Sequence, residues 1–542
     1  MSFTISGNIV NIFSREIYQG EIFVADGKIV SIKKKKCHSR NFILPGFIDA
    51  HIHVESSMMP PAEFARVAVS HGTVATVSDP HEIANVLGVK GIKYMLAEGR
   101  KVNFKFYFGV PSCVPATNFE TAGAEITAGN IETLFQQGEL SYLAEFMNWP
   151  GVIQKDPECL AKIAVAKKFG FPVDGHAPGL KGLQAKKYIQ GGISTDHECF
   201  TLEEALDKLK YGMKIIIRDG SAARNFSALA PLIDSHPHKL MFCSDDKHPD
   251  DFLEGHINKL VARSVSMGKN LFDVLRIASW NPAQHYKINT GFLRQGDPAD
   301  FIITEDLRDF NVLQTYINGE LVAERGKCFI PPQKPEIQNN FKCRKTKPRD
   351  FKIKAKPGKI NVISALDEQL VTRCLEMEPF ILNGEVCSDT KRDILKLTVL
   401  NRYKPSPPSV AFIKNFGLKR GAIASSVAHD CHNIIATGAD DDSISRACNL
   451  IIREKGGISL INGKKEIILG LPIGGIMSPK PAKEIAKKYQ ELSQAAKKLG
   501  SKLKAPYMTL SFMALLVIPE LKLSDKGLFD GRTFRFKNVF VG

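Results

Sequence analysis

Two histidines follow an apolar run near the start of the sequence and stand two residues apart. The run, residues 42–48, is typical of a buried strand, and it leads into His51 and His53. On a strand, side chains at i and i+2 point to the same face, so both imidazoles can reach one point. Neutral imidazole is a common ligand of divalent transition metals. This spacing favours a metal centre over a pair of packed or surface histidines.

Four more residues of metal-binding types end or follow later apolar runs. They are Glu145, His176, His197 and Asp245. We expect His51, His53 and Asp245 to hold one divalent ion and the other two histidines to hold a second. Glu145 would then bridge the two ions and offset their repulsion. Each histidine taken alone is more often structural, but together they are better explained as ligands.

The expected metal centre would perform hydrolysis. A metal-bound water falls to a pKa near ~7 and becomes a hydroxide nucleophile at neutral pH. A carboxylate beside it can take its proton and pass it to a leaving group, and Asp245 fits that role. Asp79 and His81 follow another apolar run. They could bind a further ion, position the substrate, or cap a helix that starts near Ile83.

Residues 41–290 must position these side chains. Strand-like runs alternate there with helix-like stretches, which predicts eight βα units and a catalytic (β/α)8 TIM barrel. The expected strands are residues 43–48, 73–78, 104–110, 140–146, 171–175, 192–195, 213–217 and 240–244. Active sites of such barrels lie at the carboxyl ends of the strands, where the residues above fall.

Two further domains are expected beside the barrel, which makes the chain an α/β protein overall. Residues 1–40 and 291–345 contain short strands with Asp26-Gly27 and Asn318-Gly319 turns. We expect the two segments to form one small β-domain, the alternative being two unrelated hairpins. Residues 350–542, behind a Lys- and Pro-rich linker, are predicted to form an α+β domain. Gly474-Gly475 in this region indicates a turn rather than a phosphate-binding loop.

The composition limits the partners. The 542 residues carry a formal net charge of +16, but the basic residues are scattered and no aromatic-interleaved basic platform is present, so no nucleic-acid partner is expected. The eleven cysteines include no C-x-x-C pair, and the sequence has no secretory signal and no apolar run of about 18 residues. We therefore expect a cytoplasmic protein with free thiols and no membrane span.

Longer segments around the candidate ligands match one known family. Residues 45–53 (PGFIDAHIH) resemble the first-strand signature of the amidohydrolase superfamily. The sequence is more specifically similar to the bacterial and archaeal adenine deaminase family. The segments that carry this similarity are 54–59, 79–88, 144–148, 174–179, 194–198, 218–223 and 244–246, with 428–433 (AHDCHN) and 471–475 (LPIGG) in the C-terminal region. Cys431 departs from the family pattern, where a serine is expected.

The resemblance implies hydrolytic deamination of adenine to hypoxanthine and ammonia, in purine salvage. It also implies a divalent metal centre, expected to be binuclear, with Mn²⁺ or Fe²⁺ ahead of Zn²⁺. The matching ligand positions are His51, His53, Glu145, His176, His197 and Asp245, with Glu145 where many superfamily members have a carboxylated lysine. In the implied reaction a metal-bound hydroxide attacks C6 and Asp245 shuttles the proton. Glu198, Glu82 or Glu55 could protonate the ring nitrogen N1, and the sequence leaves this choice open.

Other possibilities remain at this stage. His429, Asp430, His432 and Asn433 form a polar cluster outside the barrel, interpreted as an inter-domain hydrogen-bond network. Alternatively, these residues close over the barrel mouth, from this subunit or from the partner in an expected homodimer. A different amidohydrolase reaction on a cyclic amide or amidine, of the dihydroorotase or hydantoinase type, would use the same metal chemistry. A catalytically silent binding protein would not need six converging ligands.

Overall fold

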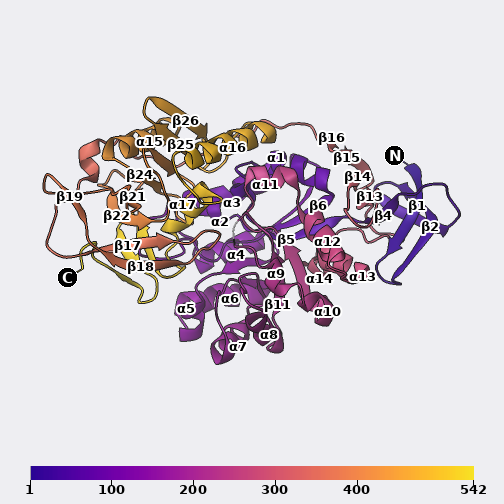
Figure 1. Ribbon diagram of the computed structural model, residues 1–542. Helices are drawn as coiled ribbons and strands as arrows, with labels where there is room; N and C mark the ends of the chain where they lie inside the picture. Colours follow the sequence, from indigo (N-terminus) through magenta and orange to yellow (C-terminus); the bar gives the residue numbers. More distant parts are fainter. Residues whose placement is uncertain (1, 222, 542) are drawn as a thin grey trace.

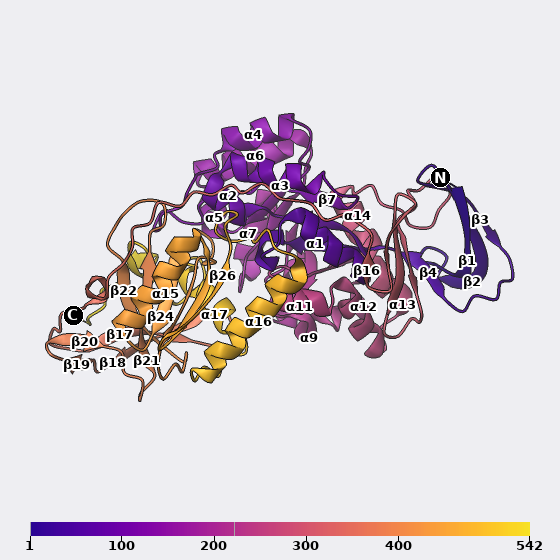
Figure 2. The ribbon, with the colours of Figure 1, turned by 90° about the horizontal axis from the view of Figure 1, so that it is seen from above.

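The chain forms three parts in a row, with a barrel between a small sheet and a larger C-terminal domain (Figure 1). The computed structural model describes residues 2–221 and 223–541. Ala222, which belongs to the matching segment 218–223, lies outside the described residues. The small sheet contains the N-terminus, and the C-terminal domain lies on the opposite side of the barrel (Figures 1 and 2).

The central part is a closed ring of eight parallel strands, as predicted. The strands are β5 (Phe47–Ile52), β6 (Thr73–Ser78), β7 (Lys105–Phe108), β8 (Leu143–Phe146), β9 (Val173–Gly175), β10 (Thr195–Asp196), β11 (Lys214–Arg218) and β12 (Leu240–Cys243). Parallel ladders join the neighbouring strands in three groups, which are β5-β6-β7, β8-β9 and β10-β11-β12. A bridge between Val110 and Leu143 joins β7 to β8, and the Ser194 amide donates to the Val173 carbonyl (2.9 Å) between β9 and β10. A bridge between Ile52 and Asp245 closes the ring.

Helices follow most of these strands and cover the outside of the ring. They include α1 (Pro61–Ala68), α2 (His81–Leu87), α3 (Val89–Gly99), α4 (Ala128–Gln136), α6 (Pro157–Phe169), α7 (Gly182–Gly191), α8 (Leu202–Lys210), α11 (Pro249–Glu254) and α12 (Ile257–Ser266). Helix α8 is an example of how a side chain caps the first turn of such a helix. The Thr201 side chain accepts a hydrogen bond from the Glu204 amide (3.2 Å), which satisfies one free donor of the first turn. Ala205 and Leu209 are buried on the face of α8 toward the barrel.

The first apolar run is divided between two sheets, which corrects the expected single strand over residues 43–48. Its first half is β4 (Phe42–Pro45) in the small sheet, and the barrel strand β5 begins at Phe47. Gly46 lies at the corner between them. A Cβ atom at this position would lie 2.4 Å from Cγ1 of Val74, so only glycine fits without displacing the neighbouring strand.

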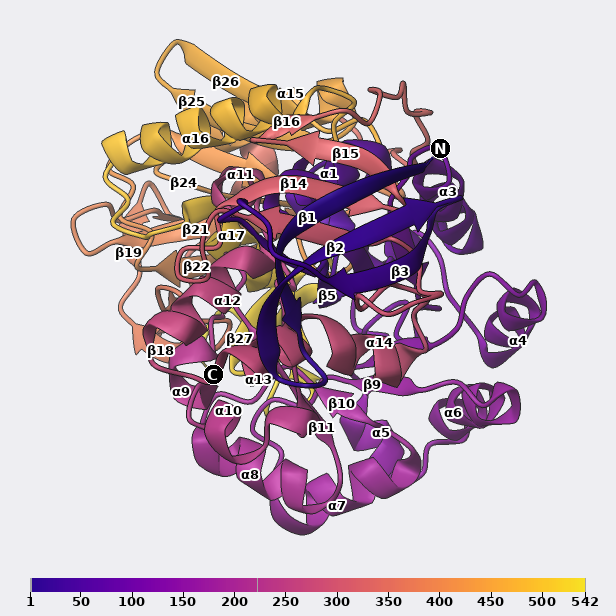
Figure 3. The same cartoon turned by 90° about the vertical axis from the view of Figure 1, so that its right-hand side faces the viewer.

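The two flanks of the barrel pair in one sheet rather than in two separate hairpins (Figure 3). Its strands are β1 (Ser2–Asn11), β2 (Glu16–Ala25), β3 (Lys28–Lys34), β4, β13 (Phe301–Thr304), β14 (Val312–Ile317), β15 (Glu320–Glu324) and β16 (Lys327–Cys328). The spatial order is β16-β15-β14-β13-β4-β1-β2-β3, so β4 joins the two flanks. Ile9, Val24 and Phe301 are buried in its own small core. We keep the expected boundaries of the three domains as a proposal.

The C-terminal domain contains a second eight-stranded sheet, of order β18-β17-β22-β21-β24-β23-β25-β26. These strands are β17 (Ile360–Ala365), β18 (Thr372–Met377), β21 (Ile394–Leu400), β22 (Ser409–Lys414), β23 (Ala422–Ser425), β24 (Ile434–Gly438), β25 (Gly457–Asn462) and β26 (Lys465–Gly470). Helix α15 (Asp441–Glu454) packs on β23, β24 and β25. Helix α16 (Ala482–Lys498) contacts β25 and β26 and also reaches α11 of the barrel (Figure 2).

No helix in residues 2–221 and 223–541 is both long and apolar enough to span a membrane. All eleven cysteines are free thiols.

The Gly46 corner yields a prediction about stability. Gly46→Ala should lower the free energy of unfolding by about 1–3 kcal/mol, because the added methyl group overpacks against Val74. Thermal melting of the two proteins measures the loss. Gly129→Ala is the matched control, because a Cβ at Gly129 in α4 would meet only Oγ1 of Thr127, at 3.8 Å. Equal melting temperatures of the wild type and the Gly46 variant would contradict this account of the corner.

Candidate metal centre

The six expected ligand residues meet at the carboxyl ends of the barrel strands. His51 is in β5, with His53 next to its end. Glu145 is in β8, His176 and His197 directly follow β9 and β10, and Asp245 lies two residues after the end of β12. All six side chains belong to buried residues, none more than 7% exposed. Nε2 of His51 lies 3.2 Å from Nε2 of His53. Oδ1 of Asp245 lies 3.5 Å and 3.1 Å from these two nitrogens, respectively.

Glu145 lies between the two halves of this cluster. Its Oε1 lies 3.3 Å from Nε2 of His53. Its Oε2 lies 2.8 Å from Nδ1 of His176 and 3.3 Å from Nε2 of His197. One carboxylate oxygen therefore faces the His51–His53 half and the other faces the His176–His197 half, which is the arrangement a bridging carboxylate needs.

The electrostatics of the cluster depend on this carboxylate. Burial raises the pKa of Glu145, but the charge of His176 and hydrogen bonds from the surrounding histidines outweigh it and hold the pKa well below its ordinary value. Burial likewise raises the pKa of Asp245, while Arg218, His51 and His53 bring it well below the ordinary value. Both carboxylates are therefore anionic at neutral pH and offer charged oxygens to the centre of the cluster.

The donor set fits one or two divalent cations. Two imidazole nitrogens that face each other at 3.2 Å in a buried place need a proton or a cation between them. Several triads of histidine nitrogens and carboxylate oxygens lie within 4.8 Å of one another, among them His51, His53 and Asp245. Imidazole and carboxylate donors together suit Mn²⁺, Fe²⁺ or Zn²⁺.

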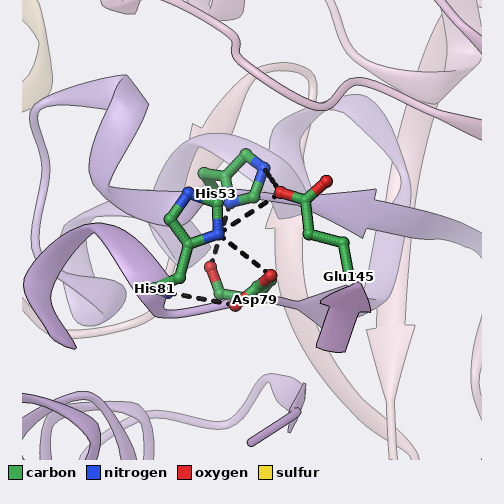
Figure 4. Close-up of side chains that lie close together, drawn as sticks. All are labelled: His53, Asp79, His81 and Glu145. Carbon is green, nitrogen blue, oxygen red and sulfur yellow. Dashed lines mark hydrogen bonds and ion pairs between the residues drawn. The ribbon is translucent and has the colours of Figure 1, made fainter. Parts of the chain in front are cut away.

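Asp79 and His81 extend the cluster on one side (Figure 4). Nδ1 of His81 lies 3.0 Å from Oδ2 of Asp79 and 3.3 Å from Oε1 of Glu145. Oδ1 of Asp79 also accepts the backbone amide of His81 (3.0 Å), the first residue of α2. The carboxylate of Asp79 thus holds the start of the helix, which favours the capping alternative, and it orients His81 toward the site.

Arg218 is a site residue to which the sequence argument gave no role. It ends β11 and is 2% exposed. Its Nη1 lies 2.5 Å from Oε1 of Glu198, its Nη2 lies 3.2 Å from Oε2, and Nη1 also pairs with Asp245. Its position at a strand end was the available signal, but its two partners are 20 and 27 residues away in the sequence. The guanidinium fixes two carboxylates that the sequence argument had selected.

The three candidate proton donors lie in different places. Glu198 and Glu82 line the cavity that contains the candidate ligands, whereas Glu55 is absent from its lining. Oε1 of Glu55 instead accepts the backbone amide of Ile83 (3.2 Å), and burial raises the pKa of Glu55 to about 7. The structure therefore brings two of the three candidates to the site.

The polar cluster of the C-terminal domain lies at the barrel mouth. Nδ1 of His429 is 2.6 Å from Oε1 of Glu82, and Nε2 of His432 contacts Oε2 of the same carboxylate. His429 and Asp430 line the same cavity as the candidate ligands. The cluster is an inter-domain hydrogen-bond network, and within this one subunit it also closes over the mouth. Asn433 faces elsewhere, since its side-chain amide donates to the Thr121 carbonyl (2.9 Å).

The pairing of Arg218 yields a prediction. Arg218→Met should destabilise the protein by about 3–5 kcal/mol, because it removes the cation between the buried carboxylates of Glu198 and Asp245. Scanning calorimetry measures the loss. Adding Glu198→Gln to this variant removes one of the two buried negative charges and should restore part of the stability. A double variant less stable than Arg218→Met would contradict this electrostatic explanation.

Comparisons with known proteins match both large domains. Residues 42–322 match the amidohydrolase family, and residues 369–535 match the adenine deaminase C-terminal domain. An adenine deaminase of Sulfurovum sp. (strain NBC37-1) is 55% identical over 530 residues, covering 98% of each chain. An adenine deaminase of Salinibacter ruber is 51% identical over 542 residues, covering 100% of this chain and 99% of the relative. One of Methanosarcina mazei is 50% identical and covers 99% of each chain.

Proposed function

We propose that this chain, which belongs to the adenine deaminase family of the amidohydrolases, catalyses the hydrolytic deamination of adenine to hypoxanthine and ammonia. The observation that carries the proposal is the 50–55% identity to three adenine deaminases over nearly the whole chain. The alternative of cyclic-amide hydrolysis is not favoured, because the match includes the adenine deaminase C-terminal domain as well as the barrel. The expected role in purine salvage follows from this reaction.

The metal sites form part of the proposal. His51, His53 and Asp245 would hold one divalent ion, His176 and His197 would hold a second, and Glu145 would serve both. The distances around the Glu145 carboxylate support this division. We expect Mn²⁺ or Fe²⁺, with Zn²⁺ as the alternative. When bound, the metal centre would supply an activated water as the nucleophile.

The residues of the chain would move the protons. Asp245 would accept the proton of the attacking water and pass it to the departing amine of adenine. The guanidinium of Arg218 keeps this carboxylate ionised and fixes its orientation, so it is present in the form that can take up a proton. Arg218 would act as a positioning residue that holds Asp245 and Glu198 in fixed orientations.

Ring nitrogen N1 of adenine must also receive a proton, and we propose that Glu82 delivers it. Both oxygens of Glu198 already accept hydrogen bonds from the guanidinium of Arg218. Glu82 instead lies 2.6 Å from Nδ1 of His429. Burial raises the pKa of Glu82, but the charges of His429, His432 and His81 outweigh it and hold the pKa well below its ordinary value. The proton of this pair therefore lies on His429, and it would reach N1 through Glu82. Both carboxylates line the cavity. Glu198 remains the second candidate.

We also propose that the protein works in the cytoplasm. The eleven free thiols support a reducing compartment such as the cytoplasm. The homodimer and the absence of a nucleic-acid partner stay predictions from the sequence.

Adenine turnover after metal removal and restoration tests the reaction and the metal centre together. The stripped protein should be inactive, and Mn²⁺, Fe²⁺ or Zn²⁺ should restore the loss of adenine absorbance and the release of ammonia. His51→Ala should lose both metal and turnover, whereas His238→Ala, an exposed histidine outside the cluster, should keep both. Turnover of dihydroorotate or hydantoin, with none of adenine under any metal, would contradict the proposed reaction.

A pair of variants distinguishes the two candidate acids. Glu82→Gln should lower kcat by about 10²–10⁴-fold, the range typical of a lost general acid, with metal content unchanged. Glu198→Gln should lower it less, because this carboxylate is proposed to position rather than to donate. The reverse order of the two losses would assign the donor role to Glu198.

A further inference from the structure

We propose that the C-terminal domain builds the apolar wall on which the adenine ring rests, with Phe512 as the stacking residue and Lys522 as the residue that positions this wall. The inference rests on the proposed function and names the part of the site that recognises the base. It gives the C-terminal domain a role in substrate binding in addition to its contact with Glu82.

The lining of the cavity divides by chemistry and by domain. The barrel supplies Arg218 and most of the histidines and carboxylates, with His429 and Asp430 added by the C-terminal domain. The apolar part consists of Met147, Leu370, Phe512 and Leu515. Only Met147 of these four belongs to the barrel. A purine base needs an apolar or aromatic surface against its ring faces as well as polar groups at its edge. The barrel alone would therefore present a polar site with little surface for the flat base.

Phe512 is held in a fixed orientation. It begins a short helix, η6 (Phe512–Ala514), directly after α17 (Pro506–Ser511), and it is 4% exposed. One face of its ring stacks on His429, with centroids 4.7 Å apart and planes 14° apart. His429 in turn contacts Glu82 of the barrel. A ring fixed on one face by an imidazole can stack a base on the other face without losing rotamer freedom on binding.

Lys522 joins the two segments that form the wall. It lies in β27 (Leu521–Ser524) and is fully buried. Its Nζ donates to the Leu370 carbonyl (2.6 Å) and to the Phe512 carbonyl (2.9 Å). Both carbonyls belong to residues that line the cavity, although Leu370 is 152 positions away from Lys522. One ammonium group therefore sets the distance between the two parts of the wall.

A purely structural role explains this lysine poorly. Within the described residues, its hydrogen-bond partners are these two carbonyls and no carboxylate pairs with it. Burial accordingly lowers the pKa of Lys522 to about 7. A buried ammonium without a counter-charge costs stability, and an unbranched apolar side chain would fill the same space at lower cost. What lysine adds is a pair of directional hydrogen bonds between two distant segments.

Steady-state kinetics of metal-loaded protein tests the inference. Phe512→Leu keeps an apolar side chain but removes the ring, and it should raise the KM for adenine by about 5- to 100-fold. Lys522→Met keeps the length and removes the donors, and it should raise KM by about 3- to 10-fold. Both variants should change kcat less than KM and leave the metal content at the wild-type value, because the barrel ligands are untouched.

Lys396→Met is the matched control for Lys522→Met. Lys396 is also a buried lysine of the C-terminal domain, and its Nζ donates to the Phe351 carbonyl (3.0 Å) and to Asp441 (2.7 Å), away from the cavity lining. This control should lower the melting temperature without changing KM.

The outcomes separate the inference from the function on which it rests. If the wild type deaminates adenine and both Phe512→Leu and Lys522→Met keep its KM, the inference is overturned and the proposed function stands. An equal rise of KM in Lys396→Met would also overturn it, since general loosening of the domain would then explain the effect. If Lys522→Met fails to fold, Phe512→Leu decides the question. Absence of adenine turnover by the metal-loaded wild type would overturn the proposed function, and the inference with it.

Discussion

The buried carboxylate of Glu145 lies between two pairs of histidines, and the organisation of the barrel mouth depends on it. One oxygen faces His53 (3.3 Å) and the other faces His176 (2.8 Å). Without this negative charge, buried imidazoles from several strands would converge with less compensation for the water they have lost. The same geometry would let two divalent cations share one anionic ligand. The Glu145 carboxylate that stabilises the buried histidines is therefore also suited to binding metal.

The mouth of the barrel is completed by a second domain. Glu82 follows β6 of the barrel, but its carboxylate is held by His429 and His432 of the C-terminal domain. His429 also fixes the ring of Phe512. A purine presents a polar edge and two apolar faces, and in this chain the groups suited to each come largely from different domains. The packing of the two domains therefore brings the groups of both to one cavity.

The local patterns of the sequence predicted much of the barrel and its candidate ligands. Alternation of apolar runs and amphipathic stretches indicated eight βα units, because strand and helix periods depend on neighbouring residues. The i, i+2 spacing of His51 and His53 placed both on one side of a strand for the same reason. The family resemblance then selected adenine as the substrate, which no spacing of ligands could do, since one metal chemistry serves many substrates.

Contacts between distant segments decided the rest. The sequence alone indicated which polar residues lie near the ends of the barrel strands, but only the tertiary structure divided the first apolar run between two sheets at Gly46. The tertiary structure also paired Arg218 with Glu198 and Asp245. It placed Glu55 away from the cavity. It brought Leu370, Phe512 and Lys522 to the barrel mouth. Local periodicity carries no information about such pairs, because the packing of whole domains sets which distant side chains meet.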